Sequence, residues 1–223
     1  MQRYVARIAM IVFLLASAFA GNPSTPATSS FPAAAADSPL AASKSERTAV
    51  FAGGCFWGIQ AVFQHVKGVI SATSGYSGGS AKTAAYEVVS TGETGHAESV
   101  KVIYDASRIT YGQLLRVFFS VAHDPTQLNR QGPDEGSQYR SVIFYSTDEQ
   151  KRIAQAYVAQ LDGAKLFSRP IVTQLVSLTA FYPAESYHQD YATLHPDDPY
   201  ILYNDAPKVA HLRQQFPELY TGH

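Results

Sequence analysis

The chain has 223 residues, of which 46% are hydrophobic and 16% are charged, fractions typical of a soluble globular protein with one sizeable core. Its formal net charge of -1 argues against nucleic acid as a partner, because contact with phosphate backbones requires a basic surface. The chain holds a single cysteine, Cys55, so an internal disulfide is excluded, and this residue is either core filler or a reactive thiol.

The N-terminus has the pattern of an export signal. Two arginines precede an apolar run over residues 8–15, and a small-x-small cleavage motif follows at residues 18–20. The pattern predicts a signal peptide over residues 1–20, cleavage before Gly21, and a location in the periplasm or outside the cell. An uncleaved membrane anchor is the alternative, although the run is short for a bilayer, which needs about 20 apolar residues.

Residues 21–47 are rich in Ala, Ser, Thr and Pro and lack hydrophobic periodicity. This composition predicts a disordered linker between the export signal and the folded part of the chain. One folded domain is therefore expected over residues 48–223.

Strand and helix patterns alternate from Thr48 onward. Residues 48–52 are β-prone and end at two glycines, and residues 55–67 show apolar residues at helical spacing. The three glycines within residues 74–80 predict a loop. Further strands are expected over residues 69–72, 99–104, 141–145 and 171–178.

Two further helices are predicted from their first residues. Thr110 with Gln113, and Thr147 with Gln150, have the spacing of a capping box ahead of an apolar run. The tail after Phe181 holds several prolines and many tyrosines, so it is expected to be mostly irregular and packed over the core. Interleaved strands and helices predict the α/β class, here an α+β two-layer sandwich in which a mixed sheet packs against helices.

Cys55 stands at a position suited to a reactive thiol. It follows the pair Gly53-Gly54 and opens a predicted helix, whose free N–H groups stabilise a thiolate. A small buried hydrophobe is the common alternative for a free cysteine. Export from the cell, where idle thiols oxidise, and the strand-to-helix turn both favour the reactive thiol.

Phe56 and Trp57 follow the cysteine directly. They either pack the start of the helix or form an apolar box beside the thiol, shaped for a methyl or thioether group. These two interpretations stay open on the residues alone.

The segment Gly54-Cys55-Phe56-Trp57-Gly58 resembles the signature of the peptide methionine sulfoxide reductase A family, which repairs oxidised methionine. Further segments match blocks of that family in family order and, with the signature, cover nearly all of residues 48–203. They are Gly75-Tyr76-Ser77-Gly78-Gly79, Thr94-Gly95-His96-Ala97-Glu98, His123-Asp124-Pro125-Thr126-Gln127, Gln138-Tyr139-Arg140-Ser141 and Phe181-Tyr182-Pro183-Ala184-Glu185.

The resemblance implies roles for four catalytic residues. Cys55 is implied as the nucleophile that attacks the sulfoxide sulfur and becomes a sulfenic acid, and Glu98 as the acid that protonates the sulfoxide oxygen. Tyr86 and Tyr139 are implied as the phenols that hydrogen-bond that oxygen. A proton donor at neutral pH needs a carboxyl group with a raised pKa, so we expect Glu98 to be buried.

The resemblance further implies that Phe56 and Trp57 hold the substrate's methyl group and that Asp134 orients substrate or reductant. It implies reduction of the S epimer, free or in proteins, with no bound cofactor. The spacing of the histidines gives no ligand-like cluster, so no metal is expected. Nothing in the sequence demands more than a monomer, and cleavage of the signal is expected to leave the protein free of the membrane. The sequence His96-Ala97-Glu98 has the form of a zinc deaminase motif but lacks the required Pro-Cys-x-x-Cys partner.

In one respect the chain departs from much of the family. Many members carry further cysteines near the C-terminus that convert the sulfenic acid to an internal disulfide, and this chain has none. Recycling is therefore expected to use an external thiol, either a thioredoxin-like protein or a small dithiol.

Two alternatives of other classes remain. A secreted cysteine hydrolase is one, because His188 and Asn204 follow Cys55 at papain-like spacing, although the local hydrolase signature is absent. The other is a non-catalytic module that binds oxidised methionine through the aromatic box. Apart from the hydrolase alternative, His188 and His195 are expected to be structural.

Overall fold

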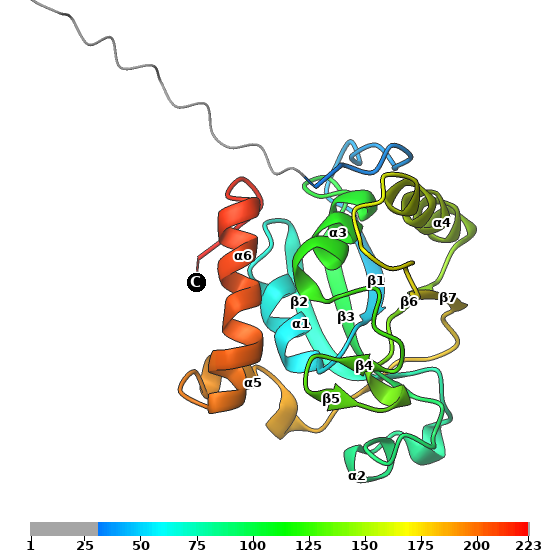
Figure 1. The fold of residues 1–223 in the computed structure, drawn as a ribbon. Coiled ribbons are helices and arrows are strands. Elements are labelled where there is room, and N and C mark those ends of the chain that lie inside the picture. Colours follow the sequence, from blue (N-terminus) through cyan, green and yellow to red (C-terminus); the bar gives the residue numbers. More distant parts are fainter. Residues whose placement is uncertain (1–30, 223) are drawn as a thin grey trace, which may run out of the picture.

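The computed structural model describes residues 31–222 (Figure 1). The predicted signal peptide and residues 21–30 of the predicted linker lie outside this range. Within it, no helix is long and apolar enough to cross a membrane.

A six-stranded mixed sheet forms the centre of the fold, in the order β7-β6-β1-β3-β2-β8. All neighbouring strands are antiparallel except β6 and β7, which are parallel. A separate two-stranded hairpin joins β4 to β5. The strands are β1 (Glu46–Ala52), β2 (Val69–Ser77), β3 (Ala97–Asp105), β4 (Arg130–Gln131), β5 (Asp134–Glu135), β6 (Val142–Tyr145), β7 (Gln174–Ser177) and β8 (Tyr182–Pro183).

Helices pack on the sheet, and α1 lies between the sheet and α6 (Figure 1). The short α2 lies at the end of the molecule where the β4–β5 hairpin is found. The α-helices are α1 (Phe56–Gln64), α2 (Tyr86–Val89), α3 (Tyr111–Val117), α4 (Asp148–Gly163), α5 (Tyr191–Leu194) and α6 (Ala206–Gln215). Shorter turns are the 3-10 helices η1 (Ala81–Thr83), η3 (Ser137–Tyr139) and η4 (Ser186–His188), and the π-helices η2 (Phe118–Ala122) and η5 (Ile201–Asp205). The predicted mixed sheet packed against helices is confirmed.

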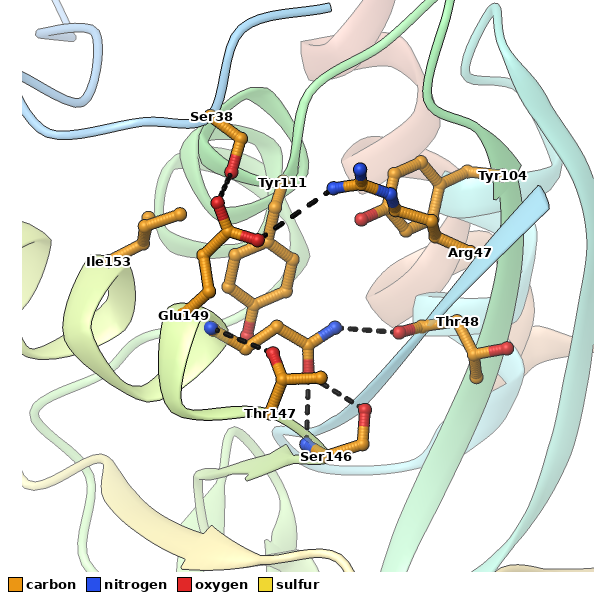
Figure 2. Close-up of a pocket in the computed structure, with 10 residues that line it drawn as sticks. Ser38, Arg47, Thr48, Tyr104, Tyr111, Ser146, Thr147, Glu149 and Ile153 are labelled. Carbon is orange, nitrogen blue, oxygen red and sulfur yellow. Dashed lines mark hydrogen bonds and ion pairs between the residues drawn. The ribbon is translucent and has the colours of Figure 1, made fainter. Parts of the chain in front are cut away.

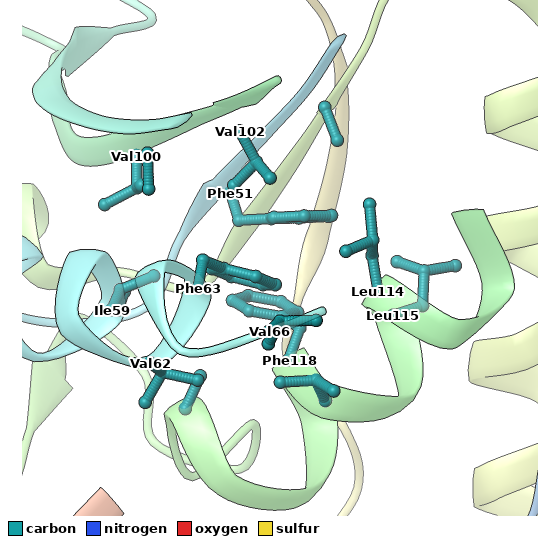
Figure 3. Close-up of a cluster of buried hydrophobic side chains, with 14 of the residues drawn as sticks. Phe51, Ile59, Val62, Phe63, Val66, Val100, Val102, Leu114, Leu115 and Phe118 are labelled. Atoms are coloured by element: carbon teal, nitrogen blue, oxygen red, sulfur yellow. The ribbon is translucent and has the colours of Figure 1, made fainter. Parts of the chain in front are cut away.

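The main core lies between the sheet and α1, α3 and α4 (Figure 3). Phe51 of β1 stacks on Phe63 of α1 and on Phe118 of η2, with ring centroids 5.2 and 5.0 Å apart. Ile59, Val62, Phe63 and Val66, the apolar stripe expected for this helix, are all buried. Alternate residues of β1, such as Val50, face a smaller cluster that Leu178 and Phe181 cover from the other side of the sheet.

The capping residue of each predicted helix is where the sequence placed it. Thr110 and Gln113 form a complete capping box at α3, and the Thr147 side chain accepts the backbone N–H of Gln150 at α4. At α4 the Gln150 side chain accepts the backbone N–H of Ser146 instead of that of Thr147, so the capping box there is incomplete.

The loop predicted over residues 74–80 is wrong for its first four residues, which continue β2. Gly75 pairs with Ser99 on one side and Pro183 on the other. A Cβ atom at Gly75 would stand 2.3 Å from the carbonyl oxygen of Tyr182. The glycine therefore marks a close approach of two backbones inside a sheet, which a count of glycines does not distinguish from a turn.

Part of the predicted disordered linker is ordered. We call residues 31–45 the N-terminal strap, because they lie along α3 and α4 without regular secondary structure (Figure 1). Its anchors are hydrogen bonds of Phe31 to Arg116, Pro32 to Tyr157, Ala33 and Ala35 to Gln160, Asp37 to Gly112, and Ser38 to Glu149. The composition of residues 31–45 could not predict this order, because the residues that bind the strap lie far away in the sequence.

Beneath the strap, Glu149 accepts a hydrogen bond from Ser38 and lies 3.9 Å from Arg47, beside a cavity of about 270 Å³ (Figure 2). The residues that line this cavity include none of the seven predicted site residues. The tail is also more regular than expected, since α6 and the turns η4 and η5 fall within it.

Candidate active site

A glycine turn sets the position of Cys55. Strand β1 ends at Ala52, and Cys55 is the N-cap of α1. Gly54 has φ +101°, and a Cβ atom there would stand 2.5 Å from the side chain of Gln131. The turn requires glycine for its backbone angle and for the space that Gln131 occupies.

The Cys55 thiol is buried, with 8% of the residue exposed. Burial raises its pKa well above the ordinary value, and the nearby carboxyl groups of Glu98 and Asp205 raise it further. The backbone N–H of Trp57 lowers the pKa, which is the expected helix N-terminal effect, but burial outweighs it. In the resting protein the thiol therefore keeps its proton at neutral pH.

Glu98 lies in β3 and is 2% exposed. Burial raises its pKa to about 8, the hydrogen bond from the backbone N–H of Phe56 opposes this, and the charge of Asp134 adds to it. That N–H lies 3.1 Å from Oε2 of Glu98. The expected buried carboxyl with a raised pKa is therefore present, and it is mostly protonated at neutral pH.

Tyr86 begins α2 and Tyr139 ends η3. Burial raises the pKa of each phenol, and Glu98, Cys55 and Asp134 all raise both further. Because the pKa of both phenols is raised by the same three residues, both phenols lie near Glu98, Cys55 and Asp134. Both phenols stay protonated and can donate hydrogen bonds.

Phe56 and Trp57 form an aromatic wall at the start of α1. The Phe56 ring lies 5.1 Å from the ring of His188, centroid to centroid. Trp57 stacks on Tyr191 at 3.8 Å and meets the edge of Tyr200 at 5.8 Å. The wall thus includes rings of the C-terminal tail, and these contacts show that Phe56 and Trp57 pack at the start of the helix.

Asp134 in β5 accepts a hydrogen bond of 2.5 Å from the hydroxyl of Tyr200. Burial raises the pKa of Asp134, and this bond opposes the rise. Phe56 and Trp57 follow Cys55 in α1, the Phe56 N–H binds Glu98, and Trp57 and Asp134 both contact Tyr200. Tyr86 and Tyr139 are both influenced by Cys55, Glu98 and Asp134, so the structure brings all seven predicted residues together.

Sequence reasoning missed the residues that the tail contributes, which are Tyr191, Tyr200, Asp205 and Lys208. It gave His188 a role in the hydrolase alternative and otherwise a structural one. The one signal available was the density of tyrosines in the tail, and spacing gives no means of choosing among them.

The hydrolase arrangement is absent from the site. Both ring nitrogens of His188 are buried with no hydrogen-bond partner, and the Asn204 side chain donates to the carbonyl oxygen of Tyr200. A cysteine hydrolase needs its histidine bonded to the thiol and oriented by a third group. Among residues 31–222, no three His, Cys, Asp or Glu side chains are grouped to hold a metal ion.

The family of peptide methionine sulfoxide reductases matches residues 47–220. The chain belongs to this family. It is 64% identical over 180 residues to peptide methionine sulfoxide reductase MsrA 2 of Mesorhizobium japonicum, covering 81% of this chain and 92% of that one. It is 54% identical to MsrA 2 of Synechocystis, covering 76% of this chain and 79% of that protein.

Solved structures agree with the assignment. Methionine sulfoxide reductase A of Corynebacterium diphtheriae is 34% identical with a TM-score of 0.59, covering 68% of this chain and 76% of that chain. The reduced form of Mxr1 from Saccharomyces cerevisiae is 30% identical with a TM-score of 0.61, covering 72% and 90%. The protein is therefore an oxidoreductase that reduces methionine sulfoxide, and the hydrolase and non-catalytic alternatives are set aside.

Proposed function

We propose that Cys55 is the nucleophile and Glu98 the proton donor in the reduction of methionine sulfoxide by this protein. One observation carries the proposal: Oε2 of Glu98 is held by the backbone N–H of Phe56, the residue next to Cys55. The donor carboxyl and the thiol are thus fixed to the same helix start. With both groups protonated at rest, the site holds the two protons that the reaction must move.

The chemistry balances with these two groups. Glu98 gives its proton to the sulfoxide oxygen, which makes the oxygen a better leaving group, and regains a proton from the Cys55 thiol. The Cys55 sulfur attacks the substrate sulfur and forms a transient S–S bond. The protonated oxygen then passes from the substrate sulfur to the Cys55 sulfur, so the S–O and S–S bonds to the substrate both break and Cys55 is left as a sulfenic acid. The substrate sulfur gains two electrons and leaves as methionine, while the cysteine sulfur loses two.

Substrate orientation follows from the walls of the site. The sulfoxide sulfur is chiral, so a site that fixes its oxygen, its methyl group and the line of attack accepts one epimer. We propose that Tyr86 and Tyr139 bind the oxygen, that Phe56 and Trp57 enclose the methyl group, and that the epimer is S. Asp134, through Tyr200, orients the substrate or the incoming thiol.

Recycling of Cys55 requires a thiol from outside the chain, because Cys55 is its one cysteine. An external thiol forms a disulfide with the sulfenic sulfur and releases water, and a second thiol then restores Cys55. A thioredoxin-like protein or a small dithiol has this chemistry. We further propose export to the periplasm or beyond, where the protein works as a monomer on free or protein-bound methionine sulfoxide.

The test uses the chain from Gly21, the start predicted after signal cleavage, so that the N-terminal strap is retained. The protein is incubated with dithiothreitol and racemic methionine sulfoxide, beside a Cys55→Ser variant. We expect loss of the S epimer alone, and a decrease of more than about 10³-fold in the variant, because the serine hydroxyl is a far weaker nucleophile. Equal loss of both epimers, or activity that survives the substitution, would overturn the proposal.

A further inference from the structure

An ion pair between a buried acid and a partly buried lysine lies in the C-terminal tail, at the start of α6. Nζ of Lys208 is 3.0 Å from Oδ1 of Asp205, and the two side chains are 18% and 0% exposed. The surface pair Lys44 and Glu46, at 3.5 Å, is 71% and 56% exposed. Removing two charges from water costs free energy, so a pair with so little exposure is weak evidence for a gain in stability and points to another role.

The pair touches the helix that carries the nucleophile. A Cβ atom at Gly58 would stand 2.1 Å from Oδ1 of Asp205 and 2.7 Å from Nζ of Lys208. Gly58 follows Cys55 by three residues, and residues three apart share a helix face. The ammonium group therefore lies about one helical turn from the thiol, in space that any side chain at position 58 would take.

Apart from His188 in η4, which packs against Phe56 and whose pKa is lowered by burial, the remaining titratable groups around the thiol are acids or phenols. They come from every element that packs on it: Glu98 in β3, Asp134 in β5, Tyr86 in α2, Tyr139 in η3, Tyr191 in α5, Tyr200 before η5, and Asp205 at the start of α6. Lys208 supplies positive charge near this set, and it also lowers the pKa of His123, which burial brings to about 4, leaving a neutral imidazole. None of these acids and phenols carries a positive charge, so without Lys208 a thiolate formed among them would lack a counter-charge.

Asp205 is bound in an unusual way. Its second carboxylate oxygen, Oδ2, is buried without a hydrogen-bond partner. Buried carboxylates are normally satisfied at both oxygens, so holding Lys208 is the main contact that this one makes. The Lys208 ammonium group is thus held in one position by Asp205, while one oxygen of that carboxylate stays without a hydrogen bond.

We propose that Lys208, fixed by Asp205 against Gly58, is a positioning residue that supplies the counter-charge for the Cys55 thiolate as it forms. The inference rests on the proposed role of Cys55 as nucleophile. The role of Lys208 is electrostatic: its charge favours loss of the thiol proton, and Lys208 does not contact the substrate.

The test measures the rate at which iodoacetamide alkylates Cys55 as a function of pH. Cys55 is the one cysteine, so the label reports a single thiol, and no sulfoxide is needed. In Lys208→Met we expect the midpoint to move to higher pH and the rate at neutral pH to fall about 3–10-fold, because a smaller fraction of the thiol is then ionised. Lys208→Arg should restore most of the rate, and Lys44→Met should match the natural protein.

A second pair of variants is used if Lys208→Met unfolds the protein by leaving the buried Asp205 carboxylate without its ion-pair partner. Asp205→Asn removes the acid, and the double variant D205N/K208M removes both charges, so neither leaves a buried carboxylate without its partner. We expect the double variant to alkylate at higher pH than Asp205→Asn alone. Superimposed pH profiles within this pair, or between folded Lys208→Met and the natural protein, would show that Lys208 only joins α6 to α1 and would overturn the proposal.

Discussion

The N-terminal strap and the C-terminal tail both wrap around the domain, but the polar groups of the strap are hydrogen-bonded, whereas several buried polar atoms of the tail are not. The strap is held by hydrogen bonds that its backbone and Asp37 make to α3 and α4. The tail surrounds the site and leaves buried polar atoms without partners, at His188 and at Asp205.

The same difference extends to the residues that the tail packs against. Among the described residues, the other buried polar side-chain atoms without partners are Nε1 of Trp57, which stacks on the tail, and Oε1 of Gln138, beside Tyr139. Each such atom costs about 1–3 kcal/mol, and such costs persist in native proteins where function requires them. The comparison teaches that the strap serves stability, whereas the tail gives up stability to shape the site.

The largest effect that sharpens this comparison is expected at Glu98. The substitution Glu98→Gln removes the proton donor and should lower kcat about 10²–10⁴-fold in a steady-state assay with dithiothreitol. In the natural protein, kcat should fall as pH rises through about 8, because the donor loses its proton there. A variant with unchanged kcat would remove Glu98 from the mechanism.

The same substitution should make the fold more stable. The pKa of Glu98 is raised from 4.5 to about 8, so the folded protein keeps a proton that the unfolded chain releases. Native stability therefore falls as pH rises across this window, and Glu98→Gln should recover about 1–3 kcal/mol near pH 8. Chemical denaturation at pH 4 and pH 8 measures this, and a gain confined to pH 4 would contradict it.

A smaller effect on activity is expected from the tail at Tyr200. Tyr200→Phe keeps the ring against Trp57 and removes the hydrogen bond to Asp134. This bond fixes the carboxyl that we propose orients the substrate or the incoming thiol, so we expect kcat/KM to fall about 10–100-fold. Losing a hydrogen bond to a charged group also costs about 1.5–3 kcal/mol of stability, so the melting temperature should fall as well. Tyr203→Phe, at a highly exposed tyrosine, is the matched control. An equal loss in both variants would argue against a specific role for the bond.

The smallest effect is expected in the strap, and it should fall on stability alone. Asp37 accepts hydrogen bonds from the backbone N–H of Gly112 and from Thr110 at the start of α3. Asp37→Ala should cost about 1–2 kcal/mol and lower the melting temperature by about 2–8 °C, with kcat unchanged. Glu218→Ala serves as the control, and a drop in kcat would break the division between strap and tail.

Sequence predicted best where the signal is local. The apolar stripe of α1, the caps of α3 and α4, and the alternation within β3 each depend on neighbours within a few residues. The burial that raises the pKa of Glu98 was expected from its chemistry and is present.

Sequence failed where a partner comes from far along the chain. Gly75 lies inside a strand because Tyr182 packs against it, and the strap is ordered because α3 and α4 accept it. The tail residues Tyr200 and Lys208 reach the site only through the folded path of the chain. No spacing rule connects them to Cys55.

The central claim is that the oxygen of methionine sulfoxide passes to Cys55. Its most direct test mixes the reduced protein with one equivalent of methionine S-sulfoxide in the absence of any added thiol, and then traps sulfenic acid with dimedone for mass spectrometry. We expect one methionine per protein and one dimedone adduct, on Cys55, since no second cysteine competes for the sulfenic acid. Methionine formed without an adduct on Cys55, or no methionine at all, would contradict the account.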